Sequence, residues 1–258
     1  MKTQQIIELL ERKVGGKLTE AQSIDDILGG IKNRHYLMSD SQKIIGLNLH
    51  WCDVLDMSFL SVLKDLRQLN LGRGNVRDYS FLKHLKNLEV LILEDNMIAD
   101  ISYLSELKKL QKLDLWTNVV WSVSALSGLI NLQLLDLDSN EIYDITPLST
   151  LRNLQTLRLG FNEIYDVAPL SILTNLEFLN LEHNQLIDIS PLTALKNLKS
   201  LNLSSNQITG ISLSFLESFP KLEKLELYDN PIQNIPKELF NTSENRLKDI
   251  RMYLESME

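Results

Sequence analysis

The chain is 258 residues long, and 53 of these residues are leucine and 21 are asparagine. Leucine is far above ordinary usage, yet hydrophobic residues make up only 44% of the chain and charged residues 23%. This balance excludes a disordered chain, and no apolar run approaches the length of a membrane-spanning helix. The net charge of −8 argues against nucleic acid or a membrane surface as the main partner.

Residues that commonly carry chemistry are few and scattered. The single cysteine, Cys52, excludes a disulfide framework and a cysteine-built metal site. The four histidines lack metal-binding spacing, and the sequence contains no phosphate-binding loop and no nucleophile elbow. The first five residues lack the basic and apolar regions of a signal peptide. We therefore expect a cytoplasmic monomer that has no enzymatic activity, no cofactor and no metal.

Residues 1–40 are predicted to form an N-terminal helical cap. Residues 3–12 begin with Thr3 and place isoleucine and leucine at helical spacing, which predicts a first helix. A second short helix is predicted to begin near Ser23 and to stop at Gly29 and Gly30. A cap is needed because the end of a stack of repeats exposes its core.

Residues 41–240 form nine repeated units. Counting the first residue of a unit as position 0, apolar residues recur at positions 0, 3, 6, 8, 13, 16 and 19, and asparagine recurs at position 11. Every unit has 22 residues except the eighth, which has 24. Nine copies in phase are a specific signal of a repeat protein. The units begin at Ser41, Leu63, Leu85, Leu107, Leu129, Leu151, Leu173, Leu195 and Phe219.

Each unit is predicted to be a strand, a turn and a short helical turn. Positions 5 to 9 alternate apolar and polar residues, as a strand with one buried face does. Thr146-Pro147 and Ser190-Pro191 resemble an N-cap followed by the first helical position. Stacked units would place their strands about 4.8 Å apart and close a leucine core. We predict an α/β repeat solenoid with a parallel β-sheet on its concave face and helical turns on its convex face.

The repeated asparagine at position 11 is predicted to be structural. The chain bends after each strand and leaves backbone groups inside, and an amide side chain can both donate and accept hydrogen bonds there. Cys52 and Gly74 occupy this position in the first two units, and we interpret Cys52 as a small buried substitute rather than a nucleophile. The asparagines concerned are Asn96, Asn118, Asn140, Asn162, Asn184, Asn206 and Asn230.

Residues 241–258 are predicted to form a C-terminal helical cap. Residues 243–256 have a helical pattern, and we expect their apolar side chains to cover the last repeat. These side chains are Leu247, Ile250, Met252, Tyr253 and Leu254.

The repeat resembles the leucine-rich repeat family, in the 22-residue form found in bacterial proteins and phosphatase regulators. The sequence pattern of residues 151–170 is similar to the repeat of internalins. This resemblance implies a curved solenoid that binds a protein on its concave face. Residues 244–254 are also similar to the segment that closes the repeats of bacterial Roco-type proteins. That second similarity implies a stand-alone relative or the recognition part of a larger signalling chain. The alternative function is therefore a recognition or regulatory subunit of a signalling enzyme, of GTPase or phosphatase type, carried on a separate chain or a larger protein.

An aspartate recurs at position 15 and permits two interpretations. A column of carboxylates about 5 Å apart could bind calcium. Alternatively, each carboxylate caps the helical turn that follows it, which we consider the stronger interpretation. The residues are Asp56, Asp78, Asp100, Asp144, Asp166 and Asp188.

The concave face is the predicted binding surface. Side chains at positions 5, 7, 9 and 10 face this side, because those at positions 6 and 8 are buried. Large apolar groups on a polar face are typical of an interface, and acidic neighbours favour a partner protein with a basic surface. The apolar candidates are Ile92, Trp116, Leu134, Phe161 and Phe178. The charged candidates are Glu94, Asp114, Asp136, Asp138 and Arg158.

A second candidate surface lies at position 14, just past the asparagine. Trp121, Tyr143, Tyr165 and Ile187 recur every 22 residues and are expected to form one exposed ridge on a rim of the solenoid. One interpretation is a ladder of side chains that only stiffens the turns. The other is an extension of the concave binding surface.

Overall fold

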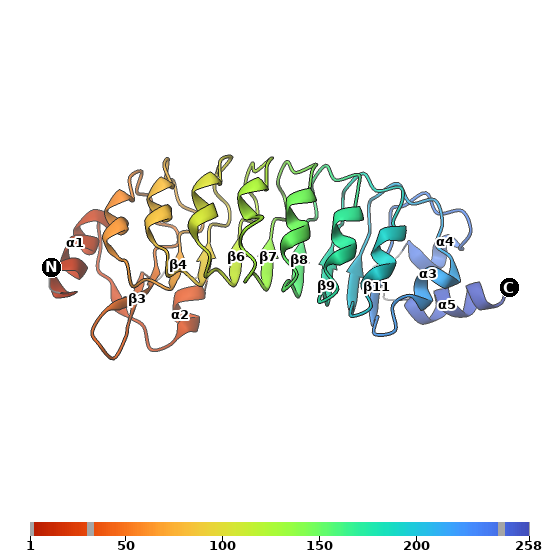
Figure 1. Ribbon diagram of the computed structural model, residues 1–258, viewed down its shortest axis with the longest axis horizontal. Helices are drawn as coiled ribbons and strands as arrows, with labels where there is room; N and C mark the ends of the chain where they lie inside the picture. The colour runs from red at the N-terminus through yellow and green to blue at the C-terminus, as the bar shows by residue number, and fades with distance from the viewer. Residues whose placement is uncertain (1–2, 30–33, 242–245, 258) are drawn as a thin grey trace.

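The computed structural model describes residues 3–29, 34–241 and 246–257. Figure 1 shows the units stacked side by side along one axis, with the two ends of the chain at opposite ends of the stack. The strands follow one long side of the molecule and the short helical turns lie across the stack from them. The predicted repeat solenoid is therefore confirmed.

The strands form a single sheet in chain order, from β1 to β11. From β3 onward every neighbouring pair is parallel, and equal positions of successive units pair with each other, as Leu91, Leu113 and Leu135 do. The strands are β1 Thr19–Glu20, β2 His35–Met38, β3 Ile44–Asn48, β4 Gln68–Asn70, β5 Val90–Ile92, β6 Lys112–Asp114, β7 Leu134–Asp136, β8 Thr156–Arg158, β9 Phe178–Asn180, β10 Ser200–Asn202 and β11 Lys224–Glu226.

The repeat strands are shorter than predicted, since β4 to β11 occupy only positions 5 to 7. Backbone bonds to the next coil continue beyond them, for example from Leu93 N to Asp114 O at 2.8 Å. The chain then turns through a left-handed residue at position 10. This conformation is costly for most residues other than glycine, asparagine and aspartate. Only Asp95 and Asp229 among the position-10 residues are of these types, so the recurring left-handed residue could not be predicted from the sequence. The nine position-10 residues with positive φ are Trp51, Arg73, Asp95, Thr117, Ser139, Phe161, His183, Ser205 and Asp229.

The convex side is built from short 3₁₀ helices, and an α-helix replaces the 3₁₀ helix in the longer eighth unit. The prediction that Thr146 and Ser190 are N-caps is wrong. The N-cap residues are Ile145 and Ile189, and the carboxylates just before them, Asp144 and Asp188, accept the backbone N–H of Thr146 and Ser190 at 2.9 and 2.8 Å. The helices are η1 Ser58–Val62, η2 Ser80–His84, η3 Ser102–Glu106, η4 Ser124–Leu126, η5 Thr146–Thr150, η6 Ala168–Ile172, η7 Ser190–Ala194 and α3 Leu213–Glu217.

The core is the predicted leucine column. In the third to seventh units each apolar side chain at the seven repeated positions is at most 6% exposed. Burying one such side chain contributes about 1.5–3 kcal/mol before conformational entropy is subtracted. Because the stack has no other core, these leucines hold each unit to the next.

The asparagine ladder has the predicted structural role. Asn118 Nδ2 donates to the carbonyls of Leu93 in the preceding unit and Leu115 in its own unit, both at 3.0 Å. Asn118 Oδ1 accepts the N–H of Ile98 at 3.0 Å. A second ladder, which sequence analysis did not predict, runs along the outside at position 2. There the side-chain amides of Asn87, Asn131, Asn153, Asn175 and Asn197 donate to carbonyls of the preceding unit.

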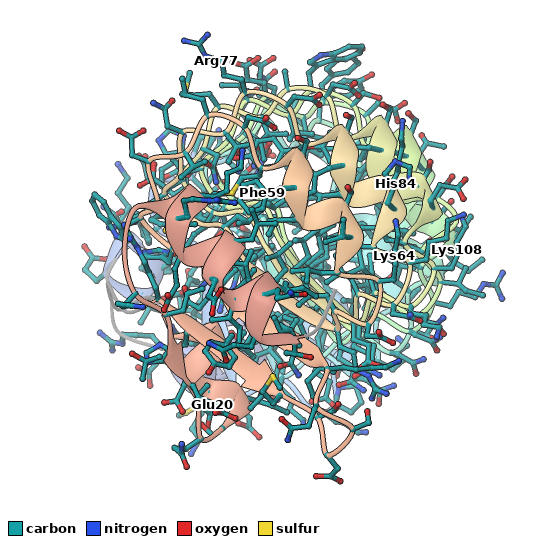
Figure 2. The ribbon with its side chains drawn as sticks, turned by 90° about the vertical axis from the view of Figure 1, so that its left-hand side faces the viewer. Glu20, Phe59, Lys64, Arg77, His84 and Lys108 are labelled. Atoms are coloured by element: carbon teal, nitrogen blue, oxygen red, sulfur yellow. The ribbon has the colours of Figure 1, made fainter. Side chains whose placement is uncertain are left out.

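The N-terminal segment contains the two predicted helices, α1 Thr3–Val14 and α2 Ile24–Leu28. Ser23 caps α2, and Gly29 ends it, whereas Gly30 lies outside the described residues. The strands β1 and β2 were not predicted, and β2 runs antiparallel to β3. The β2–β3 pair is the one antiparallel pair among the described strands, since β1 pairs with β2 in parallel. Figure 2 views the molecule from this end, with Lys64 and Lys108 on the side of the helical turns.

The C-terminal segment contains α4 Lys237–Phe240 and α5 Leu247–Glu255. The predicted helix over 243–256 therefore begins later, and 243–245 lie outside the described residues. Leu247, Ile250 and Leu254 are buried as predicted, but Met252 is 68% exposed because it lies on the outer side of α5. No helix in the described parts of the chain is both long enough and apolar enough to span a membrane.

Candidate functional site

The concave sheet face consists of the side chains at positions 5, 7, 9 and 10, and its first strands are covered by α2. Asn48 Nδ2 donates to the carbonyls of Asp26 and Gly29, at 3.2 and 3.0 Å. Ile27 is fully buried, and a Cβ built on Gly46 would lie only 3.0 Å from its Cγ1 atom. Gln68 and Asn70 on β4 are buried as well. The N-terminal segment thus closes this end of the face.

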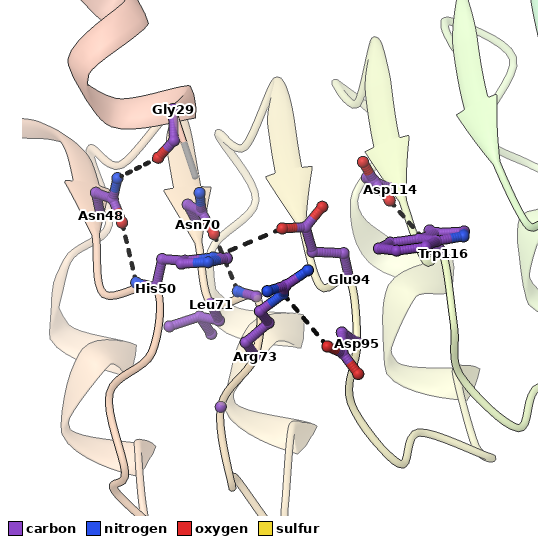
Figure 3. A network of polar contacts seen from close by, with 12 residues as sticks. Gly29, Asn48, His50, Asn70, Leu71, Arg73, Glu94, Asp95, Asp114 and Trp116 are labelled. Carbon is purple, nitrogen blue, oxygen red and sulfur yellow. Dashed lines mark hydrogen bonds and ion pairs between the residues drawn. The ribbon is translucent and has the colours of Figure 1, made fainter. Parts of the chain in front are cut away.

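A polar network follows next to the covered end (Figure 3). The buried His50 ring places its Nδ1 3.7 Å from Glu94 Oε1, and burial lowers the pKa of His50. Arg73 pairs with Asp95 at 3.3 Å and lies over the Trp51 ring at 5.3 Å from its centroid. These side chains are engaged with one another, so the accessible part of the face lies toward β6 and beyond.

Position 7 has a structural role that sequence analysis missed. Its side-chain oxygen accepts the N–H two residues later, as Asp114 does from Trp116 and Asp136 does from Asp138, both at 3.1 Å. This hydrogen bond fixes the backbone at the ends of the strands that carry it. Four asparagines make the same bond in other units, namely Asn48, Asn70, Asn180 and Asn202.

Three aspartates lie together on β6 and β7 and just beyond β7. Asp136 is 4% exposed and pairs with Arg158 at 2.9 Å. Asp138 accepts bonds from the Gly160 N–H and from Asn180 Nδ2. Burial, and then the charge of Asp136, raise the pKa values of Asp114 and Asp138 to about 6. Arg158 is bound to Asp136, so this cluster favours an additional cation.

Four large apolar side chains lie exposed or half-buried around this acidic cluster, and we call them the central patch: Trp116, Leu134, Phe161 and Phe178. Trp116 is 37% exposed, Phe161 47% and Phe178 45%, and Leu134 is half-buried. The Phe161 ring stacks on His183, with centroids 4.9 Å apart.

Two predicted site residues are not exposed. Ile92 is 4% exposed, and its register partners on the neighbouring strands are Asn70 and Asp114. Asp136 is also 4% exposed, because it is enclosed by its ion pair with Arg158. The expectation that these two side chains are available to a partner is wrong. Glu94, Asp114, Asp138 and Arg158 remain partly or fully exposed.

A cavity of about 460 Å³ lies beside the central patch. The register aligns Leu134, Thr156 and Phe178 on three successive strands, so that a small side chain stands between two large ones. Arg158 and Asn180 line the polar side of this cavity. We call this cavity the slot. Sequence analysis missed it because a lone threonine gives no signal of a hollow.

The face beyond the slot is polar and internally bonded. Asn202 Nδ2 donates to Glu182 Oε2 at 3.0 Å, and the Tyr228 hydroxyl donates to the other oxygen of Glu182. This hydrogen bond raises the pKa of Tyr228 to about 12. The side chains at this end therefore satisfy each other and leave the central patch as the main exposed apolar region of the face.

The rim ridge consists of Trp121, Tyr143, Tyr165 and Ile187, which are 56%, 49%, 63% and 64% exposed. Aromatic rings stack elsewhere, as Phe161 and His183 do, but no ring contact joins the ridge residues in the described chain. The binding interpretation of this ridge stays a prediction.

Comparison with known proteins identifies the family. The model described as "Leucine Rich repeats (2 copies)" matches residues 86–129, 152–194, 174–213 and 196–241, more than half of the chain. The chain belongs to the leucine-rich repeat family. Proteins of this family generally mediate protein–protein interactions. The predicted Roco-type similarity of residues 244–254 stays a prediction.

Solved leucine-rich repeat structures are similar over most of the chain. An internalin from Listeria monocytogenes is 29% identical with a TM-score of 0.72, over 81% of this chain and 63% of that one. Internalin C2 from the same species is 36% identical with a TM-score of 0.62, over 76% and 84%. A leucine-rich repeat protein from Leptospira interrogans is 28% identical with a TM-score of 0.66, over 80% and 50%. The chain thus spans less than two thirds of the first and third of these. No curated protein matches it in a sequence search.

The aspartate column at position 15 of the leucine-rich repeats caps the convex turns. In six units the carboxylate accepts the backbone N–H two residues later, at 2.7 to 2.9 Å. Among the described residues no group of three or more His, Cys, Asp or Glu is placed to hold a metal ion. Cys52 is buried, and burial raises the pKa of its thiol, which fits a packing role. The capping interpretation therefore accounts for these carboxylates better than the calcium interpretation.

Proposed function

We propose that this leucine-rich repeat protein is a non-catalytic interaction module that binds a partner protein on its concave sheet face. The central patch carries the proposal, because it places large apolar side chains beside partly buried carboxylates on an otherwise polar surface. Exposed aromatic groups surrounded by polar residues are typical of the energetic centre of a protein interface. The rim ridge extends the proposed contact area.

Phe161 supports the proposal through its backbone conformation. Its φ of 53° lies in the left-handed region, which costs a residue such as phenylalanine about 1–2 kcal/mol. Its ring is nevertheless 47% exposed, so burial offsets little of that cost. An exposed aromatic residue at a position that disfavours it is expected where binding, rather than stability, is selected.

The charge of the face favours a basic partner surface. The carboxylates around the central patch include the half-buried Asp114 and Asp138, and Arg158 is already paired with Asp136. Complementary charge accelerates association and excludes acidic partners. The alternative of a regulatory subunit for a GTPase or phosphatase uses the same surface, and the identity of the captured partner distinguishes the two.

The test compares partner capture by the wild type with capture by Trp116→Ala, Phe161→Asn and the double variant. Extracts of the source organism are passed over each immobilised protein, and bound proteins are quantified by mass spectrometry. We expect the double variant to capture at least tenfold less of a partner that the wild type retains, because the variant lacks two aromatic anchors.

Phe161→Asn also provides a control for folding. Asparagine tolerates the left-handed conformation, so the melting temperature of Phe161→Asn should equal or exceed that of the wild type. A second control, Ile172→Ala, removes an exposed apolar side chain from the convex side. Undiminished capture by the folded double variant contradicts the proposed function.

A further inference from the structure

The slot beside the central patch has a shape that its neighbours define. Leu134, Thr156 and Phe178 occupy the same position on β7, β8 and β9, so their Cα atoms are in direct register. Adjacent strands are about 4.8 Å apart, which places the two large side chains roughly 10 Å apart with the threonine between them. Ser200 follows on β10, so Phe178 has a small neighbour on both sides. A large side chain from outside fits between Leu134 and Phe178.

We propose that the slot receives a large apolar side chain of a partner segment that also carries a lysine or arginine. This inference rests on the proposed function and names the chemistry of the partner. The cavity of about 460 Å³ extends from Leu134 past Phe178 to Asn202 and Glu226, and its part over Thr156 suits one bulky aliphatic or aromatic group. Walls formed by Leu134 and Phe178 favour burial of apolar surface, at about 25 cal/mol per Å².

The position of the basic residue follows from the acidic cluster. Asp138 lies four residues beyond Leu134 in the same coil, just past the end of β7, which corresponds to about 14 Å along the face. Asp114 lies one strand further on. Arg158 forms its ion pair with Asp136 rather than with Asp138 or Asp114, so a cation of the partner would be placed against Asp138 and Asp114. The partner segment should therefore hold its basic group about 10–15 Å from its apolar group.

The experiment uses a displayed library of random peptides as the probe. Peptides are selected on the wild-type protein and counter-selected on Thr156→Phe, in which the slot is filled. Thr156→Phe should fold, because Phe178 already occupies the equivalent position of the next unit. Thr174→Phe, on the exposed convex side, is the matched control.

We expect the selected peptides to combine a large apolar residue with a lysine or arginine. Their dissociation constants should rise at least tenfold on Thr156→Phe and change less than twofold on Thr174→Phe. Asp138→Asn should weaken the basic peptides, and it should have no effect on peptides in which the lysine or arginine is replaced by glutamine.

Three results would overturn the inference. They are the absence of peptides that discriminate wild type from Thr156→Phe, selected peptides without basic residues, and equal losses on Thr156→Phe and Thr174→Phe. Its failure is separable from that of the proposed function. If peptides or partners are lost on the Trp116 and Phe161 variants but not on Thr156→Phe, the proposed concave binding surface stands and only the slot inference fails.

Discussion

At the scale of single residues, the repeat leaves only a few side chains free to vary. The positions that face the core need leucine or a similar residue, and position 11 needs an amide that can bond to two coils. Position 7 is less restricted, but it works best with aspartate or asparagine, because its oxygen accepts the N–H at the end of the strand. A charge at position 7 therefore has both a structural and an electrostatic effect.

Asp114→Asn separates these two effects. The amide oxygen can still accept the Trp116 N–H, as Asn70 and Asn180 accept theirs, while the charge is removed. In the folded protein the pKa of Asp114 is raised to about 6 from its ordinary value of 3.8. Wild-type stability thus falls as pH rises from about 4 to 6, because the folded state holds a proton that the unfolded state releases.

We expect Asp114→Asn to be more stable than the wild type by about 1–2 kcal/mol at pH 7.5 and equally stable below pH 4. Urea unfolding at a series of pH values measures the difference. Asp40→Asn, at an exposed position, should show little change at any pH. A stability gain that persists at pH 3.5 would contradict the assigned cause.

At the scale of elements, periodic features could be predicted from the sequence and contacts between distant segments could not. The strands, the leucine core and the asparagine ladder follow from residues that recur every 22 positions. The covering of the sheet by α2 depends on single contacts, such as those of Asn48 with Asp26 and Gly29. The burial of Ile92 and the hollow over Thr156 likewise depend on neighbours from other units.

The two asparagine ladders should differ strongly in their contribution to stability. Asn162 donates to three buried or partly buried carbonyls and accepts the N–H of Ile142, whereas Asn153 makes one exposed bond to the Ile130 carbonyl. We expect Asn162→Ala to cost about 3–4 kcal/mol and Asn153→Ala about 1 kcal/mol or less, as measured by urea unfolding. Equal losses would show that burial of these groups is unimportant.

At the scale of the whole molecule, each unit contacts mainly the units before and after it. Successive 3₁₀ helices and successive strands provide the contacts between elements along the stack. The stability of such a stack is close to a sum over units and the contacts between neighbours. The caps at either end and the α2 cover are the exceptions, since the caps occur only at the ends and α2 contacts both β3 and β4.

Removal of one whole unit should therefore be tolerated. Deleting residues 151–172 joins the fifth unit to the seventh with all positions in phase, so Leu135 would pair with Leu179. We expect a folded protein with cooperative thermal unfolding and an unchanged circular dichroism signal per residue. Deleting residues 151–171 instead leaves one extra residue and shifts the leucines out of the core face. If both deletions fold equally well, register is not what holds the stack together.

The strict pairing of equal positions from β4 to β11 has a consequence for how the gene can evolve. An in-frame duplication, loss or exchange of one 22-residue block in the gene rewrites a single rung of the binding face and leaves every other rung intact. The face can thus change its partner one rung at a time, by recombination between copies of the same template. Because the same leucine positions recur in every block, an exchanged block still packs against its neighbours.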